Sequence, residues 1–225
     1  MGDVPQPKRG GCFATLFSYF LLLAALGAGV AFWLMSKPQD FSDIGGAAES
    51  QGSRDLAVVL RESIDRDIKV TISERELNQW LAKRLVVKQG GALADKVKLE
   101  RVLVRFENDR AELILERKIK GRPFTVSMYL QVQQTESDKG VATEILLHGG
   151  PYHEQLPYPF MGGRFGRLPI PQGFLLLVMP SFRNLAAAFS EELGLIETMA
   201  RIRIEENHLV LDPGVPDDAG GFETF

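Results

Sequence analysis

The sequence has few of the residues and motifs on which enzyme sites are commonly built. It contains one cysteine, Cys12, which excludes an internal disulfide and argues against a structural metal site made of thiolates. It has no G-x-G-x-x-G stretch, no Walker phosphate loop and no G-x-S-x-G nucleophile elbow. We therefore expect a protein that is not an enzyme and that carries no cofactor.

Blocks of positive charge are also missing. The chain has 26 Lys and Arg against 29 Asp and Glu, which gives a formal net charge of -3 at pH 7. A surface that binds nucleic acid needs clustered Lys and Arg to neutralise phosphates. Nucleic acid is therefore not an expected partner.

Charge is absent altogether from the stretch Cys12 to Met35, CFATLFSYFLLLAALGAGVAFWLM. As a helix this stretch would be about 36 Å long, which exceeds the ~30 Å hydrocarbon core of a bilayer. The flanking charges are Lys8 and Arg9 before it and Lys37, Asp40 and Asp43 after it. Because positive charge resists translocation, we expect a cytoplasmic N-terminus and an exported remainder. This predicts a single-pass membrane protein.

Two other interpretations of this N-terminal stretch are open. Gly29-Val30-Ala31 has the small-x-small pattern of a signal-peptidase site, but the apolar run continues through Phe32 to Met35, which favours an uncleaved anchor. A lipoprotein would carry its cysteine after the apolar run, whereas Cys12 precedes it. A juxtamembrane thiol is therefore the favoured role of Cys12.

The rest of the chain divides by composition. We expect a cytoplasmic N-terminus over residues 1–11, the anchor over 12–35, a flexible linker over 36–53, one domain over 54–212 and a disordered tail over 213–225. The linker is rich in Gly, Ser, Asp and Pro and lacks apolar periodicity. A domain of that size can bury a core.

Apolar periodicity predicts an α+β domain. A helical face begins at Leu56, a short strand covers Ile68 to Ile72, and Ser73 to Glu76 form a capping box that opens a second amphipathic helix. From Val97 the period becomes two and continues to Leu147, with a bulge near 99–102 and short turns between successive strands. This predicts an antiparallel β-meander with one dry face, which the helices cover, and one wet face.

Residues 149–171 break every period, which predicts a long loop of functional interest. Its aromatic and basic residues suit a lipid headgroup boundary or a protein partner, although the rings could equally close the core. The candidate surface comprises Tyr152, Tyr158, Phe160, Arg164, Phe165 and Arg167.

An apolar run follows this loop. Phe174 to Met179 is too short to span a bilayer, so it is either buried or dips into the membrane interface. Pro180 should kink the helix over residues 173–194 or divide it in two, with Ser181 capping the second part and Gly194 at the C-terminal end. A hairpin from Ile202 to Leu211 should close the domain.

A metal site is a weaker hypothesis. His148, His153 and Glu154 lie close together in the sequence and could hold a divalent metal, but their spacing matches no helix-face pair. His148-Gly149-Gly150 has the form of an oxyanion loop without a nucleophile to serve it. Ordinary surface histidines are the simpler expectation.

The predicted elements are, in order, an anchor, a short helix, a meander, a late apolar helix and a closing hairpin, and the chain contains the phrase Ile72-Ser73-Glu74-Arg75-Glu76-Leu77-Asn78-Gln79-Trp80-Leu81. In this order of elements and in this phrase, the chain resembles small bacterial membrane-anchored envelope proteins. These include the YpmS-like and related lipid-binding families. The resemblance implies an anchor in a bacterial inner (cytoplasmic) membrane and an exported α+β domain with an apolar groove between its sheet and helices. It carries over no functional residue.

Three functions are open at this point. The first is binding of a lipid or other apolar ligand between the dry face and the helices over Glu74 to Leu85 and Phe174 to Leu193. The second is a structural or assembly subunit that docks on a membrane-protein complex, which the small residues Gly27 and Gly29 in the anchor slightly favour. The third is a metal-dependent or other hydrolase. A cavity lined only by apolar side chains would favour the first, and a filled core with exposed aromatics the second.

Overall fold

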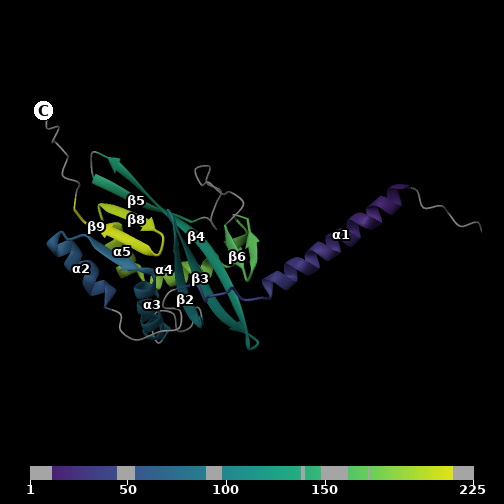
Figure 1. Cartoon of the computed structure of the whole chain (residues 1–225), viewed down its shortest axis with the longest axis horizontal. Helices are drawn as coiled ribbons and strands as arrows, with labels where there is room; N and C mark the ends of the chain where they lie inside the picture. The colour runs from purple at the N-terminus through teal and green to yellow at the C-terminus, as the bar shows by residue number, and fades with distance from the viewer. Residues whose placement is uncertain are drawn as a thin grey trace, which may run out of the picture.

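The computed structural model describes residues 12–44, 54–89, 98–137, 140–147, 162–171 and 173–214. The chain folds as a mixed α+β domain with antiparallel sheets, preceded by one long apolar helix (Figure 1). The helical elements are α1 (Cys12–Met35), α2 (Leu56–Arg66), α3 (Glu74–Gln89), the 3-10 helix η1 (Phe174–Leu177), α4 (Met179–Ala188) and α5 (Ser190–Glu197). The strands are β1 (Val70–Ser73), β2 (Arg101–Glu107), β3 (Arg110–Ile119), β4 (Arg122–Ser137), β5 (Gly140–Leu147), β6 (Gly163–Phe165), β7 (Leu168–Ile170), β8 (Arg201–Glu205) and β9 (His208–Asp212).

The predicted meander forms the larger sheet, whose strand order is β2-β3-β4-β6-β7 with β5 also paired to β4. β4 pairs with β3 along one edge, so β5 and β6 share its other edge, one after the other. Residues with positive φ, Asp109 at 62° and Gly121 at 79°, make the turns at the ends of β3. The short turns expected between successive strands are confirmed here, at Asn108-Asp109 and at Lys120-Gly121.

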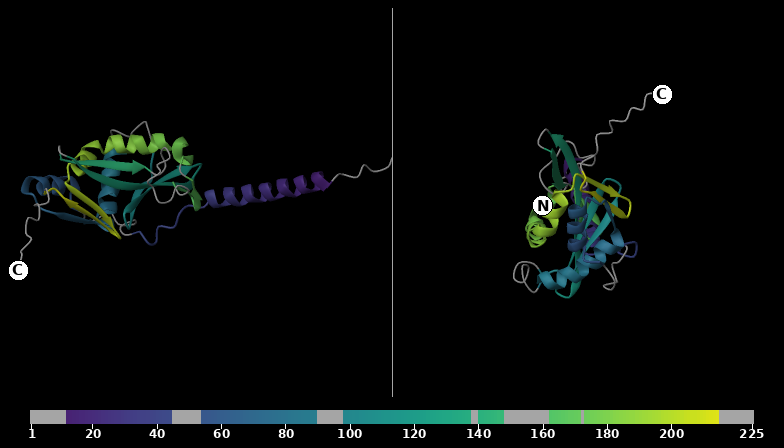
Figure 2. Two further views of the ribbon diagram at one scale, coloured as in Figure 1. Left: turned by 90° about the horizontal axis from the view of Figure 1, so that it is seen from above. Right: turned by 90° about the vertical axis from the view of Figure 1, so that its left-hand side faces the viewer.

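One face of this sheet carries the hydrophobic core. Apolar positions of β2, β3 and β4 pack with the predicted helix faces, and Trp80 of α3 meets Phe189, which follows α4, at 5.8 Å between ring centroids. Figure 2 shows α4 lying along this face, while α1 leaves from the end of the domain opposite α2 and the β8–β9 hairpin. The prediction that helices cover the dry face is therefore confirmed.

The closing hairpin belongs to a separate sheet. β9 pairs with both β8 and β1, which gives a three-stranded antiparallel sheet of order β1-β9-β8. The amide of Asp109 donates to the Ile204 carbonyl at 3.0 Å, and the amide of Ile202 donates to Gln134 Oε1 at 2.7 Å. These two bonds join the small sheet to the meander.

α3 covers the open edge of β2 with polar side chains. Asn78 is fully buried, donates from Nδ2 to the Val104 carbonyl at 2.8 Å and accepts from the Val104 amide at 2.7 Å. Glu74 accepts from the Phe106 amide at 2.9 Å. Because Glu74 and Asn78 are four residues apart on one helix face, α3 satisfies the backbone of an edge strand that would otherwise be open to pairing.

The predicted division of the late helix at Pro180 is confirmed, because η1 ends at Leu177 and α4 begins at Met179. Pro180 lies in the first turn of α4, where its missing N–H costs nothing, but Ser181 accepts from Arg117 instead of capping. Gly194 lies inside α5, which continues to Glu197, so the predicted C-terminal cap was wrong. The chain breaks instead at Phe189, whose buried ring fixes the join of α4 and α5.

The sequence predicted that the second face of the large sheet is exposed to water, but part of this face is covered. Residues 37–44, which we call the juxtamembrane segment, lie across it and bury Ile44 against Leu103 and Ile114. Glu112, placed on the wet face by its alternation, is 0% exposed. The linker predicted over 36–53 is therefore packed on the sheet in its first part, and residues 45–53 lie outside the described structure.

Candidate functional site

The structure divides the candidate residues of the long loop into two groups. Tyr152, Tyr158 and Phe160 lie outside the described residues, as do the weak metal candidates His148, His153 and Glu154. Arg164, Phe165 and Arg167 are described, and they lie in a small hairpin made by β6 and β7. The prediction of an irregular stretch over 149–171 was therefore wrong for residues 163–170.

The three described candidates do not form one surface. Phe165 packs towards the core, with its ring centroid 6.5 Å from that of Phe124. Arg164 points to the opposite face of the sheet, where its guanidinium donates to the Tyr129 hydroxyl at 3.1 Å. Arg167 lies at the tip of the hairpin beside the end of α1. Strand alternation at Arg164-Phe165 separates the two side chains.

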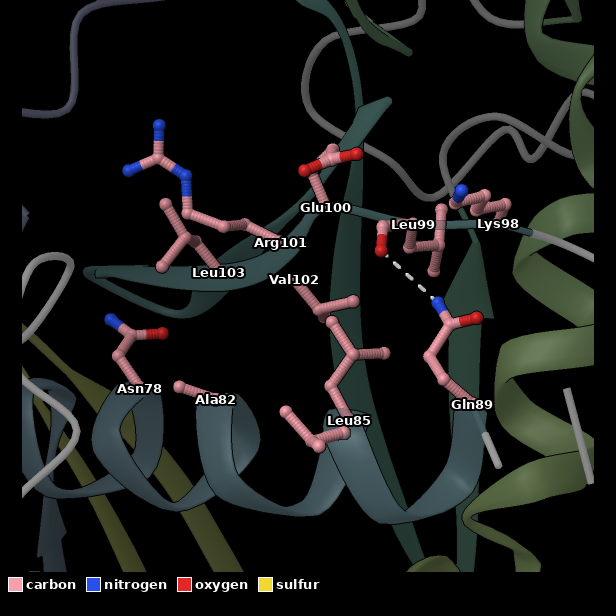
Figure 3. A pocket seen from close by; sticks show the side chains of 11 residues that line it. Asn78, Ala82, Leu85, Gln89, Lys98, Leu99, Glu100, Arg101, Val102 and Leu103 are labelled. Atoms are coloured by element: carbon pink, nitrogen blue, oxygen red, sulfur yellow. Dashed lines mark hydrogen bonds between the residues drawn. The ribbon is translucent and has the colours of Figure 1, made fainter. Parts of the chain in front are cut away.

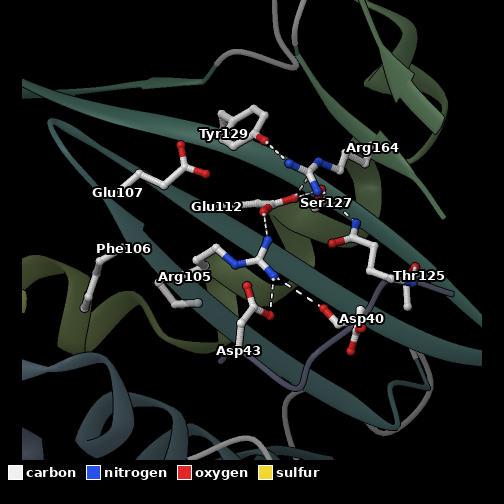
Figure 4. Close-up of polar contacts among 12 residues, drawn as sticks. Asp40, Asp43, Arg105, Phe106, Glu107, Glu112, Thr125, Ser127, Tyr129 and Arg164 are labelled. Atoms are coloured by element: carbon white, nitrogen blue, oxygen red, sulfur yellow. Dashed lines mark hydrogen bonds and ion pairs between the residues drawn. The ribbon is translucent and has the colours of Figure 1, made fainter. Parts of the chain in front are cut away.

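Arg164 belongs to a cluster of polar side chains on the second face, which we call the polar cluster: Arg105, Glu112, Ser127, Tyr129 and Arg164 (Figure 4). Its centre is the Glu112 carboxylate. Glu112 accepts from Arg105 Nη1 at 2.6 Å and from the Ser127 hydroxyl, and Arg164 Nε lies 3.6 Å from its Oε1. A buried carboxylate is thus paired with two guanidinium groups.

The register of the strands assembles this cluster. Arg105 of β2 lies opposite Glu112 of β3, and Glu112 lies opposite Tyr129 of β4. Ser127 of β4 lies opposite Arg164 of β6. Residues directly opposite one another in an antiparallel pair share a face, so four strands deliver these side chains to one place.

Burial and charge determine the protonation of the cluster. Burial alone would lower the pKa of Arg105, but the charges of Glu112 and Asp43 outweigh it and raise the pKa above its ordinary value. Burial alone would also lower the pKa of Arg164, but the charge of Glu112 outweighs it and raises that pKa above its ordinary value. Burial, with the nearby Glu112 charge, raises the pKa of the Tyr129 phenol. Both arginines are therefore charged and the tyrosine neutral at physiological pH.

The juxtamembrane segment is bonded to this cluster. The Gln39 amide donates to Thr125 Oγ1 at 3.1 Å, and Gln39 Nε2 donates to Ser127 Oγ at 3.1 Å. Arg105 Nη2 donates to Asp43 Oδ1 at 3.1 Å. Gln39 is 7% exposed, so its two bonds are made out of solvent, where they contribute most, whereas Asp43 is exposed.

The tip of the β6–β7 hairpin holds the end of α1. The Arg167 amide donates to the Leu34 carbonyl at 3.1 Å, and Arg167 Nε donates to the Pro38 carbonyl at 3.2 Å. Gly166, at φ 55°, lies so close that a Cβ there would be 2.4 Å from the Lys37 carbonyl oxygen. Carbonyl groups at a helix end lack partners within the helix, and this hairpin supplies one.

Two hollows flank these elements. The first, about 620 Å³, lies between the juxtamembrane segment and the sheet and is lined by Gln39, Asp40, Ser42, Asp43, Arg105, Glu107, Arg164 and Arg167. Its three arginines face three carboxylates besides Glu112, so it favours neither an anion nor a cation. The backbone N–H and the hydroxyl of Ser42 lower the pKa of Asp40, which keeps that carboxylate charged.

The second hollow is a groove of about 360 Å³ between α3 and the edge strand β2 (Figure 3). Its walls combine apolar side chains, such as Leu85 and Val102, with Asn78, Glu100 and Arg101. Gln89 closes one end, where its Nε2 donates to the Leu99 carbonyl at 3.1 Å. Between the dry face and both helices, where a ligand site was predicted, Met128 and Leu175 are almost wholly buried in the hydrophobic core.

Sequence reasoning missed the polar cluster and the juxtamembrane segment. One signal was present: Arg105 and Glu112 lie at equal distances from the Asn108-Asp109 turn, so a hairpin must place them opposite each other. No pattern in the sequence around Gln39 indicated that this residue is buried.

The described part of the chain has one helix, Phe13–Met35, that is long and apolar enough to cross a membrane. Among the described residues, which exclude His148, His153 and Glu154, no group of His, Cys, Asp or Glu is arranged to hold a metal. In comparisons with known proteins, no protein-family model and no curated protein matches the chain. The resemblance to YpmS-like proteins therefore stays a prediction.

Proposed function

We propose that this chain is a single-pass membrane protein that acts as a structural or assembly subunit, with its domain held in a fixed orientation against the membrane. The observation that carries the proposal is the attachment of α1 to the domain. The Arg167 amide and side chain bind the end of α1 and the Pro38 carbonyl, and Gln39 and Ile44 are buried on the sheet.

A fixed orientation suits docking on other membrane proteins. A domain that captured a soluble ligand or turned over a substrate would work equally well on a flexible tether. Here the chain orders residues 37–44, although each ordered residue costs about 1–2 kcal/mol of backbone entropy. The exposed side chains of α1 also leave its surface, including Gly27 and Gly29, open to another helix in the bilayer.

Binding of an apolar ligand is the second candidate function, and the groove between α3 and β2 supports it. The groove combines an apolar floor with a few polar groups, which is the usual composition of small-molecule sites. It lies between α3 and the edge strand β2, and not between the core face and both helices, where a lipid was first expected. A hydrolase with His148, His153 and Glu154 stays a third hypothesis.

A pair of insertions tests the assembly role. In the first variant, six Gly and Ser residues are inserted between Ser36 and Lys37, which releases α1 from the domain. In the matched control, the same six residues are inserted between Gly46 and Ala47, beyond the packed segment. The readout is the size of the complex that contains the chain in native membranes extracted with a mild detergent.

The proposal expects the first insertion to lose the larger complex and the second to retain it. If both variants retain the complex, orientation does not matter and the assembly role fails. A wild-type chain that migrates alone, together with a stoichiometric copurified lipid, would replace this proposal with ligand binding.

A further inference from the structure

Exposed apolar side chains are concentrated on one turn of the described domain. Phe174, Leu176 and Leu177 of η1 are 62%, 57% and 87% exposed, whereas Leu175 between them is 0% exposed. The described domain has other exposed large apolar side chains, but they are separate or paired: Val58, Ile68, Val86, Val87 and Ile119. Three such side chains on a single turn make a patch that water solvates poorly.

The position of this turn identifies what covers it. Leu175 packs on β6, where a Cβ added to Gly163 would lie 2.8 Å from Leu175 Cδ1. Gly163 is three residues, or about 10 Å of strand, from Gly166, which touches the end of α1. In Figure 2 the green segment that leads from β6 into α4 lies at the end of the domain from which α1 leaves.

The length of α1 places its end at a headgroup boundary. A 24-residue helix is about 36 Å long, so it exceeds a ~30 Å hydrocarbon core and its last turn lies among headgroups. Because η1 packs on Gly163, about 10 Å of strand from the contact with that end, we expect η1 at headgroup depth or just above it. Aromatic and aliphatic side chains at this depth are buried at the boundary between headgroups and acyl chains.

The tip of the β3–β4 hairpin adds charge of the expected sign. Lys120 and Arg122 are exposed there beside the exposed Ile119. Figure 1 shows this tip pointing to the side of the domain from which α1 leaves. Lys and Arg close to a bilayer are attracted to anionic lipid headgroups.

We propose that Phe174, Leu176 and Leu177 insert at headgroup level into the bilayer leaflet from which α1 emerges, so that η1 is a second membrane contact of the domain. This inference rests on the proposed membrane anchoring of α1. It adds a second point of attachment, which restrains the domain from rotating about the axis of α1.

Spin-label accessibility on the full chain tests the contact. The chain carries Cys12→Ser and one new cysteine and is reconstituted in phosphatidylcholine vesicles that contain a quarter phosphatidylglycerol. Labels are placed at Leu177→Cys on η1, at Phe20→Cys within α1 as the lipid reference, and at Val86→Cys on α3 as the water reference. Collision rates with oxygen, which concentrates in lipid, and with a water-soluble nickel chelate are compared.

The contact predicts an oxygen-to-nickel collision ratio at Leu177→Cys that is several-fold above that at Val86→Cys and approaches that at Phe20→Cys. A ratio at Leu177→Cys equal to that at Val86→Cys, with Phe20→Cys still in lipid, overturns the contact and leaves the anchor intact. Low collision rates with both reagents would show that protein covers η1, which also overturns it. A water-like Phe20→Cys would refute the anchor itself, and the inference with it.

Discussion

Replacing Glu112 by Gln removes the charge at the centre of the polar cluster while keeping the shape of the side chain. Glu112 is 0% exposed and faces Arg105 at 2.6 Å and Arg164 at 3.6 Å. Breaking a buried ion pair by removing one partner costs about 3–5 kcal/mol. Arg105 keeps Asp43 and the Asp40 carbonyl as partners, and Arg164 keeps Tyr129, so we expect the lower end, about 3 kcal/mol.

The measurement is urea unfolding of the full chain in detergent micelles. Trp80, which is buried beside Phe189, reports unfolding of the domain in a Trp33→Phe background. The matched control is Glu100→Gln, which removes a carboxylate from an exposed pair with Lys118 and should cost less than about 1 kcal/mol. A Glu112→Gln variant as stable as this control would refute the account of the cluster.

Three further predictions concern α3, α2 and the end of α1. Asn78→Ala leaves the Val104 amide and carbonyl without their partner in the protein interior, so it should lower the free energy of unfolding by about 2–3 kcal/mol in the same assay. Burial acts to raise the pKa of Asp55, but hydrogen bonds from Trp80 and Arg84 outweigh it and lower the pKa below 3.8. The charged Asp55 therefore stabilises the fold fully above its ordinary pKa, and this stabilisation is lost as the pH falls through the lowered pKa. The stability difference between wild type and Asp55→Asn, under about 1 kcal/mol at pH 7, should therefore shrink at pH 3. Gly166→Val should drive the hairpin tip from the end of α1 and speed hydrogen exchange of the Arg167 amide.

Each of these predictions has its own control or contrary result. Gly121 also has a positive φ, but a Cβ there meets nothing within 4 Å, so Gly121→Val shares the backbone strain and should leave Arg167 protected. Equal exchange of Arg167 in the two variants would contradict the proposed contact. A difference for Asp55→Asn that grows towards low pH would reverse the assigned sign. An Asn78→Ala variant of wild-type stability would mean that the edge of β2 needs no cover.

The parts of the fold that the sequence predicted are those set by local patterns. Alternation fixed which residues of β2, β3 and β4 share the core face, and the capping box placed the start of α3, where the Glu76 amide donates to Ser73 Oγ at 3.3 Å. The other half of the box did not form, because Glu76 binds Arg54 instead. A local motif predicts where a helix begins, but a charged neighbour from elsewhere in the chain can take its side chain.

The parts of the fold that the sequence did not predict depend on contacts between segments that are distant in the chain. A period of two assigns Glu112 to the face opposite the core, but it cannot say that residues 37–44 will cover that face. Gln39 and Thr125 are 86 residues apart, and neither is marked by its neighbours in the sequence. The β6–β7 hairpin was missed because its strands are three residues long and lie among Gly and Pro, which leaves no alternation to detect.

The central claim is that α1 and the domain move as one body. Double electron–electron resonance between labels at Phe20→Cys in α1 and Val86→Cys in α3, in a Cys12→Ser background and in nanodiscs, measures this directly. The account predicts a single narrow distance distribution that becomes broad when Gly and Ser residues are inserted between Ser36 and Lys37. A broad distribution in the uninterrupted chain would contradict it, because the juxtamembrane segment would then be a tether.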